Sequence, residues 1–122
     1  MTDEENHKIF GKCNWPNGHG HNYSVEVSVK GHVDVKTGMV MNLTELKAIM
    51  DECIMQPLDH KNIDADVAYF AETPSTAENI AVFIWDSMKK KLPKPDLLFE
   101  VKLWETDKNF VVYRGTLVDD LV

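Results

Sequence analysis

The chain has 122 residues, 43% of them hydrophobic, with only 6 Gly and 5 Pro, and we expect a single domain over residues 1–122. A net charge of -7 offers no general attraction for nucleic acid or anionic membranes, so we expect neither as a partner. The apolar runs are far shorter than the ~20 residues that span a bilayer, and the N-terminal residues resemble no signal peptide, which predicts a cytoplasmic protein with reduced cysteines.

The N-terminal part combines a charged start, residues 3–9, that could form a short helical turn with a cluster of reactive side chains. Residues 3–9 are charged and show no strand character, and residues 11–21 are expected to form a loop. Residues 23–29 alternate apolar and polar side chains, which predicts a half-buried strand.

His19 and His21 immediately precede this strand, with only Gly20 between them. Because residues i and i+2 of a strand share a face, both imidazoles are predicted to converge on one metal ion, and imidazole suits zinc. Hydrogen-bonded core histidines are the plainer alternative. Cys13 is a third ligand, a nucleophile or a base, and its spacing does not distinguish these roles.

The middle of the chain predicts a turn and then a helix. Asp34 and Gly38 mark the turn, and residues 39–41 form a short extended run. A capping box at residues 42–45 opens a helix that is expected to stop near Pro57. Cys53 lies on its apolar stripe, so packing explains this cysteine better than chemistry.

Residues 58–64 are too polar for another core element, but they contain Asp59 beside His60. A carboxylate can orient an imidazole for proton transfer, and a Cys-His-Asp set can be assembled from residues distant in sequence. Cys13, His60 and Asp59 are therefore candidate catalytic residues.

The C-terminal half predicts a second helix and two strands. A capping box at residues 75–78 opens the helix and accounts for Glu78, and Pro93 closes it. Residues 97–105 alternate, with Phe99, Val101, Leu103 and Glu105 on one face. Glu105 is either at an exposed strand end or in a ligand pocket, and residues 106–109 form a hairpin loop before a strand at 110–114.

The predicted order is therefore strand, helix, helix, strand, strand. It indicates an α+β fold, an antiparallel sheet with two helices packed on one face. The open sheet edges favour association with further copies of the chain.

Several motifs together resemble the 6-pyruvoyl-tetrahydropterin synthase family over essentially the whole chain. They are Gly11-Lys12-Cys13, His19-Gly20-His21-Asn22-Tyr23, Thr37-Gly38-Met39-Val40, Leu58-Asp59-His60-Lys61-Asn62, Ser75-Thr76-Ala77-Glu78-Asn79 and Glu105-Thr106-Asp107. The resemblance implies a tunnelling fold, with the sheets of a homo-trimer or hexamer joined between subunits into a barrel. It also implies conversion of 7,8-dihydroneopterin triphosphate to 6-pyruvoyl-tetrahydropterin and triphosphate, in tetrahydrobiopterin biosynthesis.

The resemblance also implies roles for individual residues. His19 and His21 match two zinc ligands, and Cys13 matches the general base, tuned by Asp59 and His60. Glu105 matches the pterin anchor, with Thr76 and Glu78 in the pocket wall.

Two features depart from the family pattern. Ala77 stands where the family usually has a second threonine, and the chain begins after the strand that carries the family's third zinc histidine. We therefore expect an N-terminally short form that lacks the family's first strand. The alternatives are an impaired isoform that assembles with full-length subunits and the related 6-carboxy-tetrahydropterin synthase, although the spacing of Cys13 from His19 favours the pyruvoyl enzyme.

Overall fold

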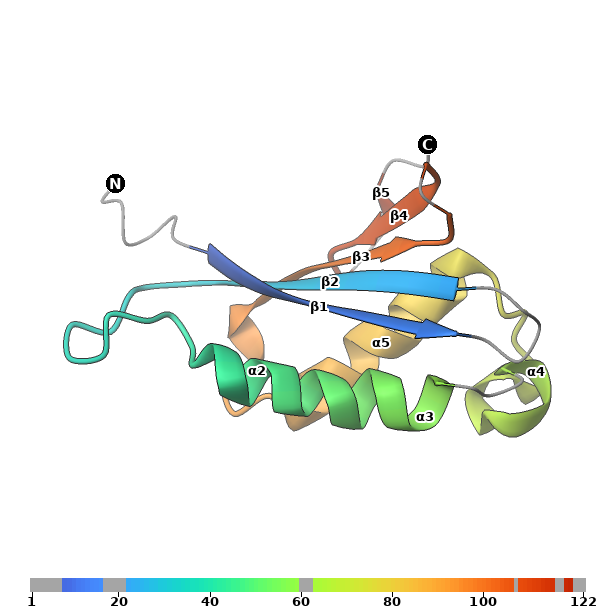
Figure 1. Ribbon diagram of the computed structural model, residues 1–122, viewed down its shortest axis with the longest axis horizontal. Coiled ribbons are helices and arrows are strands. Elements are labelled where there is room, and N and C mark those ends of the chain that lie inside the picture. Colours follow the sequence, from blue (N-terminus) through green and yellow to red (C-terminus); the bar gives the residue numbers. More distant parts are fainter. Residues whose placement is uncertain (1–7, 17–21, 60–62, 107, 116–117, 120–122) are drawn as a thin grey trace.

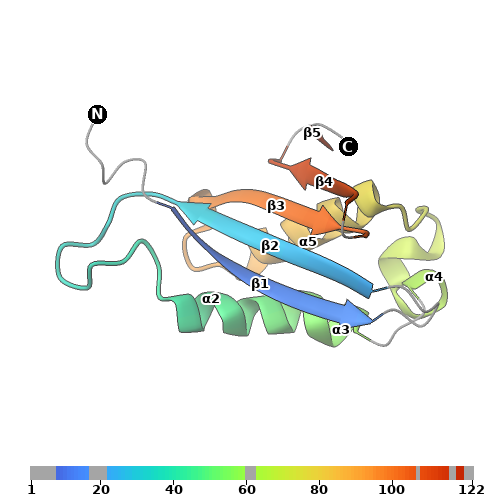
Figure 2. The ribbon, with the colours of Figure 1, turned by 45° about the horizontal axis from the view of Figure 1, so that its top comes forward.

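The computed structural model describes residues 8–16, 22–59, 63–106, 108–115 and 118–119. The strands join in one antiparallel sheet in chain order: β1 (Lys8–Pro16), β2 (Asn22–Lys30), β3 (Leu98–Trp104), β4 (Phe110–Tyr113) and β5 (Val118–Asp119). Figures 1 and 2 show the long helices on one face of this sheet. The α+β class and the one-sided placement of the helices are confirmed.

The first strand corrects the prediction for the N-terminal part. Residues 8–16 pair with β2 from Lys8 opposite Lys30 to Pro16 opposite Asn22, so the loop predicted from residue 11 is wrong as far as Pro16. A Cβ on Gly11 would lie 2.8 Å from Sδ of Met50, which shows how closely β1 approaches the first helix. Glycine, asparagine and lysine have low strand propensity, and cross-strand pairing and packing override it here.

The strand predicted at residues 23–29 is confirmed within β2. Val25, Val27 and Val29 are fully buried against the helices, and Tyr23 stacks on Trp15 at 5.3 Å between ring centroids. Four residues of β2 and Trp15 of β1 share this side of the sheet, so β2 lies at the centre of the core.

The predicted alternation along β3 is wrong at its first residues. The register shifts where Ser28 lies opposite Glu100 and Val29 opposite Leu98, which makes a β-bulge at Phe99. Leu98 is therefore buried together with Val101 and Leu103, whereas Phe99 is half-buried with the Nζ atom of Lys30 5.0 Å from its ring centroid.

The first helical segment has the predicted bounds and contains a wide turn. Asn42 caps α2 (Leu43–Met50) by accepting a 2.8 Å hydrogen bond from the Thr44 amide, as the capping box predicted. The segment continues through a π-helical turn, η1 (Asp51–Met55), into α3 (Gln56–Leu58). Pro57 lies in α3, and the helical segment ends one residue later at Leu58, so the predicted end near Pro57 is confirmed.

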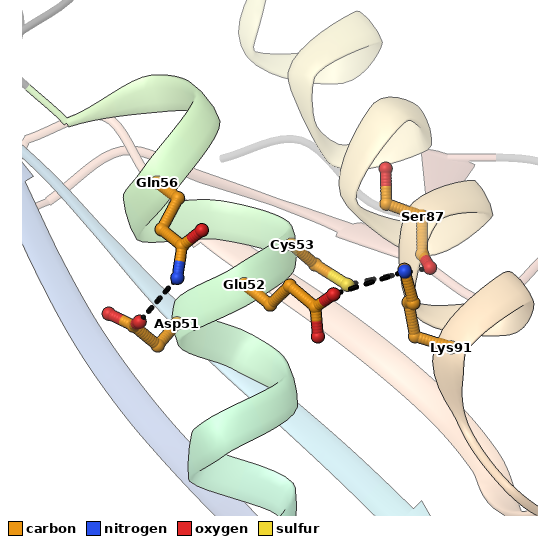
Figure 3. Close-up of polar contacts among 6 residues, drawn as sticks. All are labelled: Asp51, Glu52, Cys53, Gln56, Ser87 and Lys91. Carbon is orange, nitrogen blue, oxygen red and sulfur yellow. Dashed lines mark hydrogen bonds and ion pairs between the residues drawn. The ribbon is translucent and has the colours of Figure 1, made fainter.

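The π-helical turn holds Cys53 against the second long helix (Figure 3). Cys53 is 4% exposed, and its thiol donates to the Ser87 carbonyl at 3.5 Å. The neighbouring ion pair between Glu52 and Lys91 spans 3.0 Å and is half exposed, so it adds little stability. Burial in the core confirms the interpretation of Cys53 as a packing residue.

The second long helix, α5 (Ala77–Lys91), crosses the same face of the sheet as α2 (Figure 2). Its buried side chains meet β3, and the chain leaves it at Leu92, just before Pro93, as predicted. A helical turn, η3 (Pro95–Leu97), leads into β3.

The connection between the helices adds two short elements, α4 (Ile63–Asp66) and η2 (Ala68–Ala71). Leu58 and Ile63 are 0% and 1% exposed, so these two residues of the segment predicted to be too polar for the core do reach it, and Phe70 of η2 is 3% exposed. In the part of the chain that the structure describes, no helix has the length and apolar character needed to cross a membrane.

Candidate functional site

A pocket of about 440 Å³ opens where the start of α5 meets the hairpin between β3 and β4. Its walls are Thr76, Ala77, Glu78, Glu105, Asn109, Phe110 and Val111. The fold thus brings together Thr76, Glu78 and Glu105, the three residues that the sequence nominated for substrate binding. The volume is typical of a site for a small molecule.

The helix side of the pocket depends on the cap of α5. Thr76, rather than Ser75, is the N-cap, and its Oγ1 accepts a 3.2 Å hydrogen bond from the Asn79 amide. Asn79 also donates from Nδ2 to the Pro74 carbonyl at 2.9 Å, which ties the segment before the helix to its first turn. A hydroxyl that accepts one hydrogen bond can still donate its proton, so Thr76 can offer a donor to a ligand.

This cap also changes the interpretation of Glu78. The predicted capping box placed Glu78 three residues after the cap, but with Thr76 as N-cap it is the second residue of α5. Its carboxylate is therefore not in the position that a capping box requires. Glu78 lines the pocket in the first turn of the helix, a favourable place for a negative charge.

The strand side of the pocket is a hairpin that begins at Glu105. The Glu105 amide donates to the Asn109 carbonyl at 2.9 Å, and Oγ1 of Thr106 accepts from the amides of Lys108 and Asn109 at 3.2 and 3.0 Å. Glu105 is solvent-exposed and also forms part of the pocket wall, so the two alternatives posed by the sequence coexist.

An aromatic pair supports the base of this hairpin. Trp104 and Phe110 lie opposite each other on β3 and β4, with 4.7 Å between their ring centroids. The Nζ atom of Lys102 is 4.6 Å from the first ring centroid and 4.2 Å from the second. Phe110 also lines the pocket, so the site borders an apolar surface as well as carboxylates.

The backbone register brings Cys13 toward the same part of the sheet. Cys13 lies opposite Val25, which in turn lies opposite Leu103, two residues before Glu105. At the usual spacing of neighbouring strands, about 10 Å separates the backbones of Cys13 and Leu103. Of Cys13, only the backbone is among the described parts of the structure.

Asp59 is the residue at which α3 ends, and its side chain is half-buried. The end of α3, the end of β1, the start of α5 and the end of β3 lie at one end of the molecule in both views (Figures 1 and 2). His19, His21 and His60 lie outside the described residues. Over residues 8–16, 22–59, 63–106, 108–115 and 118–119, no group of three His, Cys, Asp or Glu residues could hold a metal ion.

Sequence reasoning missed three walls of the pocket, namely Asn109, Phe110 and Val111. A signal for two of them was present, because a short hairpin returns the chain beside the residue at which it began. The predicted loop at residues 106–109 therefore already placed Asn109 and Phe110 near Glu105.

Comparison with known proteins relates this site to one family. The family described as 6-pyruvoyl tetrahydropterin synthase matches residues 2–116. The 6-pyruvoyl tetrahydrobiopterin synthase of Homo sapiens is 63% identical over 115 residues, which cover 94% of this chain and 79% of the human one. The synthase of the same name from Drosophila melanogaster is 58% identical over 115 residues, covering 94% of this chain and 68% of the fly protein.

A more distant relative and a solved structure are also similar to this chain. The dihydroneopterin monophosphate aldolase of Pyrococcus furiosus is 37% identical over 91 residues, covering 75% of this chain and 73% of the aldolase. The structure of Caenorhabditis elegans 6-pyruvoyl tetrahydropterin synthase superposes with a TM-score of 0.84 at 29% identity, covering 90% of this chain and 96% of that one. The chain therefore belongs to the 6-pyruvoyl tetrahydropterin synthase family.

Proposed function

We propose that the chain converts 7,8-dihydroneopterin triphosphate to 6-pyruvoyl-tetrahydropterin, with loss of triphosphate, as a lyase of tetrahydrobiopterin biosynthesis. The pocket that joins Thr76, Glu78 and Glu105 is the structural observation that supports this proposal. Membership of the family supplies the reaction.

In this proposal Glu105 anchors the pterin ring. A carboxylate can accept two parallel N–H bonds from the 2-amino-pyrimidinone edge, as it does from a guanidinium group. Glu105 begins a hairpin whose backbone is hydrogen-bonded at 2.9 Å from its own amide to Asn109, which holds the carboxylate near the wall formed by α5. Thr76 offers a hydroxyl donor, and Ala77 leaves the position beside it without one.

Cys13 is proposed as the general base that removes a proton from the substrate side chain, with Asp59 and His60 tuning and relaying that proton. A thiolate is needed for this step. At the usual strand spacing the backbones of Cys13 and Leu103 lie about 10 Å apart, which is close to the length of one pterin with its side chain and supports this proposal.

The donor set formed by His19 and His21 fits zinc, since two imidazoles supply two of the three protein ligands that a catalytic zinc site usually has. Zinc would polarise the side-chain hydroxyls of the substrate and make the adjacent C–H protons more acidic. The residues of this chain would then hold the pterin through Glu105 and accept the proton at Sγ of Cys13.

We also propose a homo-oligomer, a trimer or hexamer in which sheets continue between subunits into a barrel. The sheet has β1 at one edge and β5 at the other, and β1 extends over nine residues. A long edge strand is a template for pairing with another chain. Light scattering on the purified protein would determine the assembly.

The deciding experiment is an assay of the purified protein with 7,8-dihydroneopterin triphosphate, in which the pterin product and the triphosphate are quantified separately. We expect both, dependent on bound zinc, which elemental analysis measures. Dihydroneopterin monophosphate serves as the second substrate, because carbon–carbon cleavage of it would instead indicate an aldolase such as the Pyrococcus furiosus relative.

In a second assay the chain is mixed with a full-length homologue, and turnover of the mixture is compared with turnover of the chain alone. Turnover by the chain alone supports the proposal, whereas turnover that appears only in the mixture would assign the chain a subunit role. Absence of turnover in both would contradict the proposed reaction.

A further inference from the structure

We infer that Thr106 is a positioning residue, one that fixes Glu105 for ligand binding without contacting the ligand. This inference rests on the proposed pterin site. The described residues that line the pocket include Glu105 and Asn109 but not Thr106, whose side chain is exposed.

The hydroxyl of Thr106 accepts hydrogen bonds from two described backbone amides of the hairpin loop. Oγ1 accepts from the Lys108 amide at 3.2 Å and from the Asn109 amide at 3.0 Å. Threonine and serine hydroxyls can accept from backbone amides two or three residues later, and this interaction replaces part of a backbone turn.

Asn109 is held from both sides by these contacts. Its amide donates to Oγ1 of Thr106, and its carbonyl accepts from the Glu105 amide at 2.9 Å and from the Thr106 amide at 3.4 Å. The Thr106 side chain is thus connected through the backbone N–H and C=O of Asn109 to the backbone of Glu105. Both ends of this connection, Glu105 and Asn109, are pocket walls.

The position of Glu105 explains why these hydrogen bonds of Thr106 matter for ligand binding. Glu105 is exposed and lies just after the last residue of β3, where the ladder between β3 and β4 has ended at Trp104 and Phe110. An exposed loop samples several conformations unless local contacts restrict it, and a ligand must then order it on binding. Thr106 removes part of this ordering cost before the ligand arrives.

The test is the isosteric substitution Thr106→Val, which removes the acceptor and keeps the shape. We expect about tenfold weaker binding of neopterin, followed by its fluorescence, because two amides lose their acceptor at roughly a factor of 2–10 each. In turnover the same change should raise KM by a similar factor and alter kcat little, since the anchor contributes to ground-state and transition-state binding alike.

Two further variants separate positioning from a general loss of structure. Thr106→Ser keeps the hydroxyl and should restore neopterin affinity to within about twofold, taking the usual small effect of losing an exposed methyl group. Thr37→Val is the matched control, because Oγ1 of Thr37 accepts from the Met39 amide at 3.2 Å in an exposed turn remote from the pocket walls. It should leave neopterin binding unchanged.

Amide hydrogen exchange provides a readout that needs no activity. The Lys108 and Asn109 amides should exchange faster in Thr106→Val than in Thr106→Ser. Equal neopterin affinity of Thr106→Val and the native chain would overturn the inference, as would equal loss of affinity in Thr106→Val and Thr106→Ser. A native chain that binds neopterin but shows no turnover would contradict the proposed reaction alone. The neopterin affinities of the native chain, Thr106→Val and Thr106→Ser would then still decide the role of Thr106.

Discussion

Gly115 and Gly38 allow the cost of a tight contact to be separated from the cost of an unusual backbone conformation. Gly115 has φ +100° and Gly38 has φ +72°, a region that L-residues rarely adopt. A Cβ on Gly115 would lie 2.8 Å from Cζ2 of Trp85, whereas one on Gly38 would meet nothing within 4 Å. Trp85 is 7% exposed and packs edge-on against Tyr113 at 5.5 Å between centroids, so its ring has little room to move.

The two alanine variants should therefore differ in stability. Gly38→Ala should lower the free energy of unfolding by about 1–2 kcal/mol through backbone strain alone. Gly115→Ala should lower it by about 2–5 kcal/mol, because crowding against Trp85 adds about 1–3 kcal/mol to a similar strain. Urea unfolding followed by tryptophan fluorescence, at one fixed protein concentration, measures both values.

A double variant tests whether the indole is the cause. Trp85→Phe removes the part of the ring that a Cβ on Gly115 would meet, so it should reduce the cost of Gly115→Ala by about 1 kcal/mol or more in a double-mutant cycle. Equal destabilisation by the two glycine variants, or additive effects of Gly115→Ala and Trp85→Phe, would refute this reasoning.

Three further outcomes test the site and the core. Glu105→Gln should weaken neopterin binding about 10- to 100-fold, since an amide offers one acceptor and one donor where two acceptors are required, and titration of both proteins measures it. Cys13→Ala should lower turnover about 10²- to 10⁴-fold with neopterin affinity retained, and Cys53→Ala is its matched control because Cys53 is buried in the core. Burial raises the pKa of Cys53 from 9.0 to about 11, and the nearby Glu52 carboxylate adds to this shift. The protonated thiol therefore stabilises the folded chain below pH 9, and this contribution is lost between about pH 9 and 11. Urea unfolding across this range should show a loss of about 2 kcal/mol in the native chain relative to Cys53→Ala, and identical pH profiles would contradict it.

The elements with strong local signals were predictable from the sequence. The alternation around Val25 and Val27 identified β2, and Asn42 marked the start of α2 through its side-chain cap. These signals are local because they depend on side-chain periodicity and on hydrogen bonds within one turn.

The misassigned elements depend on partners distant in sequence. β1 exists through its pairing with β2, and its own residues, Gly11 among them, favour a loop. The bulge at Phe99 is set by the register against Ser28 and Val29, which no alternation within β3 reveals. The cap of α5 was displaced by one residue because Ser75 and Thr76 are both good N-caps, and only the geometry selects the second.

The candidate site also combines residues that the sequence identifies with residues that only the folded structure reveals. The sequence nominated Thr76, Glu78 and Glu105 through family resemblance, and the fold gathers them around one cavity. Asn109 and Thr106 enter through the hydrogen bonds of the hairpin, which depend on how the loop closes rather than on residue type. The roles proposed for Cys13, Asp59 and the histidines remain predictions, and Cys13→Ala tests the first of them.

The π-helical turn at Asp51–Met55 is in effect one extra residue inserted into a continuous helix. The wider winding of this turn absorbs the extra residue, so the helix before it and the helix after it keep nearly the relative orientation of one regular α-helix. Deleting one residue within residues 51–55 would therefore restore regular winding and leave Asp59, at the end of α3, on the same side of the molecule. The same deletion in the regular turns of α2 would instead rotate everything after it by about 100°. The π-helical turn is thus a place where the chain can lose one residue without turning Asp59 away.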